Sequence, residues 1–448
     1  MSEFSTSSAS KRLFWQKNAH LEMIALIFPM LLANITAPLM GFVDIAVLGH
    51  MDGSHFLAGA SVAALILSQI YWICGFIRMS ATGLSAQAKG QKSTQSSFKV
   101  LYQSMLSAIT IAAVLVLFQQ PILTISLHFS DANELVSSVI KEYFNVRIWG
   151  APAALINLAL MGWLLGQQKN KLVMMTQVFG NLLNIGLNLF FVYVLEWQVA
   201  GVAAATVIAE YCISFLGLFF IFRANWVKPK MAWLGLKSLS ILTRLNSAML
   251  IRNLALQACL VFMTFQGIRI GEQAAAVNAL LMQFFVLIAL GLDAVAFAVE
   301  AKVGEADGSK KVRLLKENVI LGIFWSSAFA IVYAAVFVFG GKQIIQILTD
   351  LPSLQQAAGE YLLVIWLLPL VAHWCFLMDG VFVGLTRATA MRDSMIFSAL
   401  LVYFPVWWLW QDMGNWALWI ALLAFLAARG VSLSSYYVWL YYLRRLSC

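Results

Sequence analysis

The feature that most constrains this chain is a succession of long apolar stretches. A helix that crosses a bilayer needs about 20 predominantly apolar residues, and in lipid only helices and closed barrels satisfy every backbone hydrogen bond. The chain contains twelve such stretches, which lie at residues 21–49, 57–84, 98–120, 135–166, 171–195, 199–223, 240–268, 273–301, 315–340, 357–386, 394–411 and 416–443. The sequence therefore predicts an all-α polytopic membrane protein with twelve transmembrane helices.

Composition agrees with this interpretation. Hydrophobic residues make up 62% of the 448 residues, charged residues only 11%, and the mean hydropathy is +0.83. A soluble domain carries about 25% charged residues. The net charge of +9 would suit a nucleic-acid-binding protein, but the basic residues lie in short loops between apolar stretches, so we expect no nucleic-acid partner. The five cysteines follow no metal-ligand spacing, and we expect neither a disulfide framework nor a metal site.

The basic residues predict the orientation of the spans. Cytoplasmic loops of membrane proteins carry an excess of Lys and Arg. Of the 29 Lys and Arg, 22 lie on the side of the N-terminus, and only three lie near the opposite side, Lys141, Arg269 and Lys342. The other four fall within spans, at Arg78, Arg147, Arg252 and Arg429. The sequence thus predicts that residues 1–20 and 444–448 are both cytoplasmic.

The longest polar connection divides the chain into two halves. Residues 224–239 carry Pro229 and are more polar than the other connections. We expect this segment to be a cytoplasmic linker between a first lobe, residues 21–223, and a second lobe, residues 240–443. Each lobe would then contain six spans.

Short motifs repeat between the two halves. SAQAKGQ (85–91) resembles AVEAKVGEADG (298–308), and GQQKNK (166–171) occupies the place of GLTRATAMR (384–392), each with an offset of about 213–218 residues. Because each half has an even number of spans, the repeats would be parallel and related by an axis along the membrane normal. Substrate and ion sites in such folds lie near the membrane midplane.

The first span contains a carboxylate, Asp44, together with Pro29, Pro38 and Gly41. A charge inside the membrane is costly and points to function. Proline and glycine permit a spanning helix to bend, and we expect Pro38 to be the point of bending when Asp44 changes its protonation state. The alternative is an acid at the membrane interface, since Asp44 lies only a few residues from the end of the span.

Three more polar residues of the first half share a depth with Asp44. With a rise of 1.5 Å per residue, Asp44, Asn188 and Thr206 lie roughly 8–10 Å from the outer ends of their spans. Asn184 lies one turn from Asn188 on the same helix face. Such a cluster can hold a carboxylate in either protonation state and accept a proton or Na⁺. The alternative is that the three uncharged residues only join helices, at about 0.6 kcal/mol each.

A second pair of residues shares a greater depth. Arg147 and Glu210 both lie roughly 16–18 Å from the outside by the same rise. An unpaired arginine at this depth would be hard to accommodate. We therefore expect a buried ion pair, with a proton relay as the alternative role.

The acids of the second half lie nearer the cytoplasm. They are Asp293, Glu300 and Asp379. Asp293 and Asp379 are candidates for a secondary role in coupling, whereas we expect Glu300 to face solvent or to pair with Lys302.

Two further kinds of side chain lie within the spans. Arg252 and Arg429 lie mid-span, where we expect them to pair with some of the acids of this half. Aromatic faces attract cations, and methionine adapts to ligands of varied shape. Any one of these side chains, however, more often faces lipid or packs between helices. The candidates for lining a drug cavity are Met40, Phe42, Met161, Trp163, Met282, Phe284 and Phe285.

Several motifs together resemble one transporter family. GFVDIAVLGH (41–50), SAQAKG (85–90), LNIGLN (183–188) and the AVEAKVGEADG turn resemble the multidrug and toxic compound extrusion (MATE) family. EAKVGEADG together with WCFLMDGVFVGLTRATAMRDSM (374–395) resembles its DNA-damage-inducible protein F (DinF) branch. The resemblance implies a V-shaped pair of six-helix lobes in the bacterial inner membrane that exports organic cations and amphipathic compounds as protons or sodium flow inward.

The resemblance also assigns residue roles. Asp44 stands at the position of the family's coupling carboxylate in the first helix. Some relatives carry an aspartate where this chain has Asn188, so the single acid favours protons over Na⁺. Asp379 matches the family's tenth-helix aspartate only after a shift of about one turn.

These observations predict a proton-coupled multidrug exporter that works as a monomer, without a cofactor. One alternative is coupling to sodium. Another is a lipid-linked oligosaccharide flippase of the same superfamily, which the mid-span arginines Arg147, Arg252 and Arg429 would suit. An enzyme is not supported, because the chain lacks HExxH, GxSxG and phosphate-loop motifs, and we identify no catalytic residue. No span has the character of a channel filter.

Overall fold

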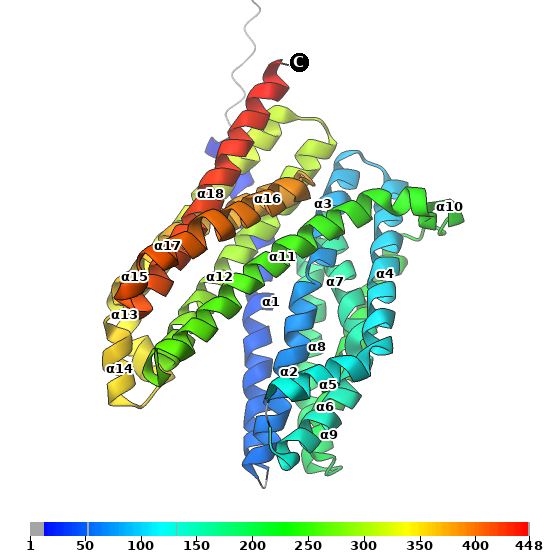
Figure 1. Cartoon of the computed structure of the whole chain (residues 1–448). Helices are drawn as coiled ribbons and strands as arrows, with labels where there is room; N and C mark the ends of the chain where they lie inside the picture. The colour runs from blue at the N-terminus through cyan, green and yellow to red at the C-terminus, as the bar shows by residue number, and fades with distance from the viewer. Residues whose placement is uncertain (1–12, 52, 131, 447–448) are drawn as a thin grey trace, which may run out of the picture.

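The computed structural model describes residues 13–51, 53–130 and 132–446. Across these residues the chain is helical and contains no strand, so the predicted all-α class is confirmed. The helices form two lobes that lie together at one end and diverge toward the other (Figure 1). The predicted two-lobed arrangement of twelve spans is therefore present.

The first lobe contains the helices up to α9. The segments are η1 (Leu13–Trp15), α1 (Lys17–Gly49), α2 (Ser54–Ile73), α3 (Phe76–Gly90), α4 (Thr94–Leu117), α5 (Gln119–Ser130), α6 (Glu134–Arg147), η2 (Ile148–Gly150), α7 (Ala151–Gly166), α8 (Asn170–Tyr193) and α9 (Gln198–Ala224). Helices α2 and α3 together form one span, and so do α6, η2 and α7. Helix α1 continues through Pro29 and Pro38 without a break.

The second lobe follows the short helix α10 (Met231–Leu234) in the linker. Its segments are α11 (Leu236–Ile270), α12 (Glu272–Gly308), α13 (Val312–Leu348), α14 (Pro352–Gly359), α15 (Leu362–Gly384), α16 (Ala388–Ser398), η3 (Ala399–Tyr403), α17 (Phe404–Leu409), η4 (Gln411–Met413) and α18 (Asn415–Leu446).

Eleven helical segments of the described chain are individually long and apolar enough to cross a membrane. The remaining predicted span, 394–411, corresponds to α16, η3 and α17, where η3 is one turn of π-helix. Pro405 lies at the start of α17. A proline lacks the N–H that would bond to the carbonyl four residues earlier, and π-helix, which is rare, occurs mostly as single turns within α-helices. The span is therefore present but divided.

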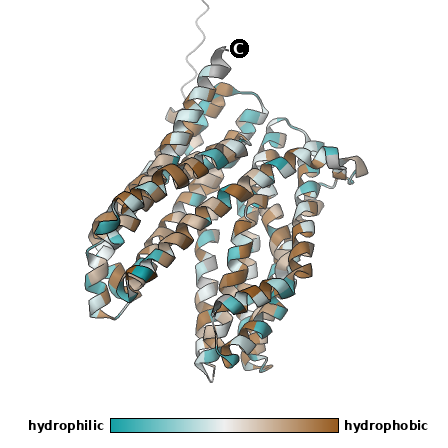
Figure 2. Ribbon diagram, viewed as in Figure 1, coloured by the Kyte–Doolittle hydropathy of each residue, from teal (hydrophilic) through white to brown (hydrophobic). Residues whose placement is uncertain are grey.

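The buried apolar side chains form three clusters, and their distribution follows the V shape. One cluster joins both lobes and includes Met30 of α1 and Phe382 of α15. The second lies within the second lobe around Trp419, and the third lies within the first lobe around Phe144. Hydrophobic residues run along the helices of both lobes (Figure 2), and many large apolar side chains are exposed, with Phe339 at 82%. Such surfaces suit contact with lipid.

The internal repeat is visible in the backbone. Lys92, Gln168, Lys310 and Thr386 follow α3, α7, α12 and α15, and each has a positive φ of 53–59°. In each loop the next N–H bonds to a carbonyl five residues earlier, as from Ser93 to Ala88. This is the hydrogen bond of a Schellman cap. The same spacing of 218 residues separates Lys92 from Lys310 and Gln168 from Thr386, so the two halves end equivalent helices in the same way.

The repeated motifs meet where the lobes join. Gln87 of α3 donates to Asp307 at 3.0 Å and to Thr386 at 3.1 Å. Gln168, in the loop after α7, donates to Glu305 at 2.6 Å. The end of α3 and the loop after α7 thus contact helix ends and a loop of the other half, and these contacts close this end of the V.

Glycines permit the close approach at this junction. A Cβ on Gly90 would lie 2.1 Å from the carbonyl oxygen of Glu305, and a Cβ on Gly308 would lie 2.1 Å from that of Gln87. Because real Cβ atoms do not approach so closely, a larger residue at either position would push the lobes apart. This end carries the loops that the Lys and Arg distribution predicts to be cytoplasmic.

Candidate functional site

Helix α1 is attached to α8 by a series of asparagine side chains. Asn170 donates to the carbonyl of Leu26 at 2.9 Å, and Asn181 donates to the hydroxyl of Thr36 at 2.8 Å. An amide inside a membrane helix bonds across to its neighbour because no water is present to bond with it. These contacts set the register of α1 along α8 and lead to a third contact at Asp44.

The four residues predicted to form a polar layer lie in one chain of hydrogen bonds. Asn188 donates from Nδ2 to Asp44 and to Oδ1 of Asn184 at 3.2 Å. Asn184 donates to the hydroxyl of Thr206 at 3.0 Å, which donates to the carbonyl of Val202 at 3.1 Å. The depth estimate from the sequence therefore identified residues that contact one another.

This chain of hydrogen bonds can serve two states of the carboxyl group. Asn184 and Asn188 are fully buried, whereas Asp44 is half-buried. Asp44 accepts a hydrogen bond from an amide, as an ionised carboxylate does. The other amide atom, Oδ1 of Asn188, is buried and has no hydrogen-bond partner among the described residues. An acceptor in this position can receive a hydrogen bond from a protonated carboxyl group or contact a small cation.

Arg147 and Glu210 form the predicted buried ion pair. Arg147 donates from Nη2 and Nη1 to the two carboxylate oxygens of Glu210, at 2.6 and 2.9 Å. Arg147 is 8% exposed, and its guanidinium lies 5.3 Å from the centre of the Tyr71 ring. Such a bidentate contact, with two parallel N–H···O hydrogen bonds, is typical of an arginine and a carboxylate. The pair joins α6 to α9 and lies farther from the outer ends of the spans than the Asp44 cluster does.

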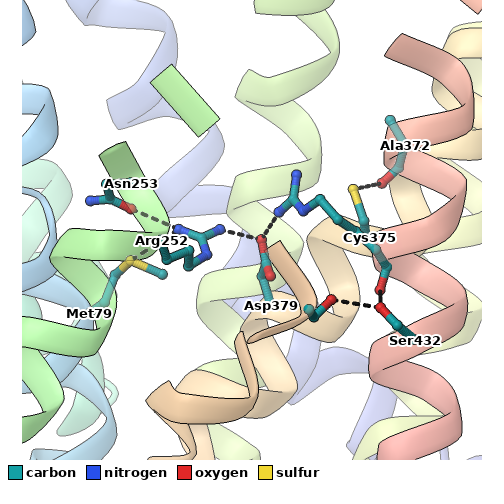
Figure 3. Close-up of polar contacts among 9 residues, drawn as sticks. Met79, Arg252, Asn253, Ala372, Cys375, Asp379 and Ser432 are labelled. Carbon is teal, nitrogen blue, oxygen red and sulfur yellow. Dashed lines mark hydrogen bonds and ion pairs between the residues drawn. The ribbon is translucent and has the colours of Figure 1, made fainter. Parts of the chain in front are cut away.

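Asp379 of α15 is held by two arginines, which confirms that Arg252 and Arg429 pair with an acid of this half. Arg252 of α11 and Arg429 of α18 both donate to Oδ2 of Asp379, the latter at 2.5 Å. Figure 3 shows Arg252 extended between Asp379 on one side and Asn253 and Met79 on the other. Both arginines are more than 90% buried, so Asp379 joins three helices of the second lobe.

The expectation for Glu300 is wrong. Glu300 is 2% exposed and accepts a hydrogen bond from Arg78 of α3 at 3.0 Å, instead of facing solvent or pairing with Lys302. Lys302 pairs with Glu22 of α1 at 2.6 Å. Arg78 was recognised as a mid-span charge, but no sequence signal linked it to an acid 222 residues away.

Asp293 of α12 differs from the other acids of this lobe. It makes no hydrogen bond or ion pair with any residue in the described part of the chain, and its side chain is partly exposed. Arg78, Glu300, Asp379 and Arg252 act on its charge from a distance. Among the candidate site acids in the described residues, Asp44 of the first lobe and Asp293 of the second lobe are therefore the two without an arginine contact.

Comparison with known proteins agrees with this architecture. The sequence profile of the MatE family matches residues 29–190 and 248–409. The chain is 39% identical to DNA damage-inducible protein F of Escherichia coli strain K12 over 92% of this chain and 90% of that protein. It is 28% identical to the multidrug resistance protein NorM of Vibrio cholerae over 44% of each chain.

A solved structure supports the fold. The outward-facing conformation of a multidrug resistance MATE family transporter superposes with a TM-score of 0.81 over 92% of this chain and 93% of that one, at 17% identity. The family profile matches each lobe once, as expected for the two repeats that the backbone displays. The chain is therefore a member of the MATE family of membrane transporters and is similar to its DinF protein.

Proposed function

We propose that this protein is a secondary active exporter of organic cations and other amphipathic compounds, driven by protons that flow inward through Asp44. The observation that carries the proposal is the contrast between Asp44 and the acids held by arginine. Among the described residues, the hydrogen-bond partner of Asp44 is an amide, Asn188, and the unpartnered Oδ1 of that amide offers a bond to the protonated form. Its charge can therefore change without leaving a buried arginine unpaired.

The positions of the lobes support an alternating-access cycle. The lobes are closed at the end that carries most of the Lys and Arg and diverge at the other (Figure 1). With the positive loops in the cytoplasm, this arrangement is outward-facing in a bacterial inner membrane, with both termini cytoplasmic. Residues 1–12 and 447–448, which contain part of these termini, lie outside the described residues.

Helix α1 is suited to transmit the protonation of Asp44. It contacts α8 through Asp44 and α12 of the other lobe through Asn34, whose amide donates to the carbonyl of Leu290 at 2.9 Å. Pro38 lies between these two contacts and cannot donate to the carbonyl of Asn34. We propose that the helix bends here when Asp44 gains or loses its proton.

The flippase alternative loses its main argument. It relies on mid-span arginines that could bind a lipid phosphate, yet all four are paired with carboxylates: Arg78 with Glu300, Arg147 with Glu210, and Arg252 and Arg429 with Asp379. Sodium coupling remains the closer alternative, because the oxygens of Asp44 and Asn188 are also suitable ligands for a hard cation.

The test is drug-driven proton movement in everted membrane vesicles. A gradient with an acidic interior is imposed in sodium-free buffer, and a cationic fluorescent drug is then added. We expect the drug to dissipate the gradient in vesicles with the wild-type protein and to have no such effect with Asp44→Asn. Vesicles with Asp393→Asn, which changes an exposed acid of α16, serve as the matched control.

Two outcomes would contradict the proposal in different ways. A response that appears only after sodium is added would replace the proton with Na⁺ and leave the exporter architecture in place. A full response in Asp44→Asn would remove Asp44 from the coupling pathway.

A further inference from the structure

Asp293 is a carboxylate inside the membrane that the proposed proton pathway through Asp44 does not include. It lies in the middle of α12, is partly exposed, and has no direct partner in the described part of the chain. Charged side chains at this depth are normally paired or functional. The residues around Asp293 therefore determine which ligand it can contact.

The register of α12 and α15 locates Asp293. A Cβ on Gly380 would lie 2.8 Å from the carbonyl oxygen of Ala296, so these two residues are in contact. Asp293 lies one turn before Ala296, and Phe376 lies one turn before Gly380. Asp293 is therefore level with Phe376 on the neighbouring helix, next to the turn that carries Asp379.

Charges of both signs surround Asp293, and none of them contacts it among the described residues. Arg78 and Arg252 favour a negative charge on Asp293 from a distance, whereas Glu300 and Asp379 oppose it. Arg252 and Arg429 share the single carboxylate of Asp379, which leaves one surplus positive charge in a buried site. Arg78 is engaged by Glu300. A bound cation would therefore supply the direct contact with Asp293 that no described residue makes.

An aromatic surface continues from Asp293 along the same helix faces. Met282, Phe285 and Asp293 are spaced so as to share one face of α12, and all three are partly exposed. The rings of Phe285 and Phe376 meet edge to face with centroids 6.2 Å apart. A cation beside a carboxylate and aromatic faces gains from both, while the apolar area accommodates the rest of the molecule.

We infer that Asp293, with Phe285 and Phe376, binds the positively charged group of a lipophilic organic cation. This site lies in the second lobe and is separate from the proton site at Asp44. The inference rests on the proposed function, since it assigns the substrate of that exporter to particular residues. The charge of the ligand is inferred from the side chain that it can reach. Arg252 and Arg429 are buried and bonded to Asp379, whereas Asp293 is partly exposed and has no partner among the described residues.

The experiment measures dye binding to the purified full-length protein in lipid nanodiscs. Ethidium, an aromatic monocation, and Nile red, an uncharged aromatic dye, are titrated into the wild type, Asp293→Asn, Asp293→Glu and Asp393→Asn. We expect Asp293→Asn to raise the Kd for ethidium at least tenfold and to change that for Nile red less than twofold. Asp293→Glu should keep most of the affinity for ethidium, and Asp393→Asn, which changes an exposed acid of α16, should bind it as the wild type does.

The outcomes separate this inference from the proposed function. Unchanged ethidium binding in Asp293→Asn would overturn the inference, while drug-driven proton movement in wild-type vesicles would still support the exporter. Equal weakening of both dyes would also overturn it, because charge would then not be what the site recognises. Tighter binding of an anionic dye such as 8-anilinonaphthalene-1-sulfonate to Asp293→Asn, with ethidium unaffected, would reverse the polarity and assign the site to anions.

Discussion

The two lobes hold their intramembrane carboxylates in different ways. In the first lobe, Asp44 contacts the side-chain amide of Asn188. In the second lobe, Asp379 lies between Arg252 and Arg429. An amide offers both a donor and an acceptor, so it suits a carboxyl group with or without its proton. An arginine offers only donors and a permanent charge, so it fixes its partner as a carboxylate.

This contrast separates groups that change charge from groups that hold the fold. Arg147 and Glu210 belong to the second kind although they lie in the first lobe, so the distinction follows the partner and not the lobe. Removing one member of a buried ion pair costs about 3–5 kcal/mol, because the other charge is left uncompensated. Substitutions at the two kinds of acid should therefore differ most in their effect on stability.

The largest effect is expected for Asp379→Asn. It removes the only carboxylate that Arg252 and Arg429 contact in the described residues, and we expect a loss of about 3–5 kcal/mol or more in the free energy of unfolding. Thermal unfolding of the purified protein in detergent measures the change. The control Asp393→Asn removes an exposed acid and should cost less than about 1 kcal/mol. Equal melting temperatures for the two variants would show that the arginine pair does not depend on Asp379.

A slightly smaller effect is expected for reversal of one charge in the Arg147 and Glu210 pair. Arg147→Glu or Glu210→Arg alone places two like charges in a buried site, and each should lower the yield of folded protein severely. The double reversal restores opposite charges and should recover a large part of the yield, as measured by size-exclusion chromatography of the fluorescently tagged protein. If the double variant folds no better than the single ones, the pair does more than provide charge balance.

Asp44→Asn should have a small effect on stability and a large one on transport. An asparagine can still accept the hydrogen bond from Asn188, so we expect the free energy of unfolding to change by about 1 kcal/mol or less. The same unfolding assay applied to Asp44→Asn and Asp379→Asn compares the two sites directly. A loss as large as that of Asp379→Asn would place Asp44 among the structural acids.

The smallest stability effect is expected for Thr206→Val at the far end of the hydrogen-bond chain. Hydrogen bonds between membrane helices contribute about 0.6 kcal/mol on average, and valine keeps the shape of threonine. We expect near-normal melting but a severalfold slower drug-driven proton movement, because Asn184 loses the hydroxyl that accepts its hydrogen bond. Proton movement at the wild-type rate would limit the functional cluster to Asp44 and the two asparagines.

Sequence reasoning identified the first-lobe site because depth along a span can be counted. Asp44, Asn188 and Thr206 lie near the ends of their helices, so a rise of 1.5 Å per residue placed them in one layer. Arg147 and Glu210 were paired by the same argument. The lobes, the repeats and the all-α class followed from the length and order of the apolar stretches.

The sequence predicts that Arg252 and Arg429 pair with acids of the second half, but the individual partners there could not be predicted in this way. The partner of Glu300 depends on which face of α12 meets α3, and that is set by the close approach of Gly90, Gly304 and Gly308 across the lobe junction. The convergence of Arg252 and Arg429 on Asp379 depends on the packing of three helices. Depth constrains one coordinate of a side chain, whereas such contacts require all three.

The most direct test of this comparison is infrared spectroscopy of the carboxyl groups during a pH titration of the protein in lipid. A protonated carboxyl group has a C=O stretching band that its carboxylate lacks. We predict that this band grows as the pH falls, that Asp44→Asn removes the component due to Asp44, and that Asp393→Asn, which changes an exposed acid, leaves that component unchanged. An identical titration in the wild type and Asp44→Asn would contradict the account, since Asp44 would then keep one protonation state throughout.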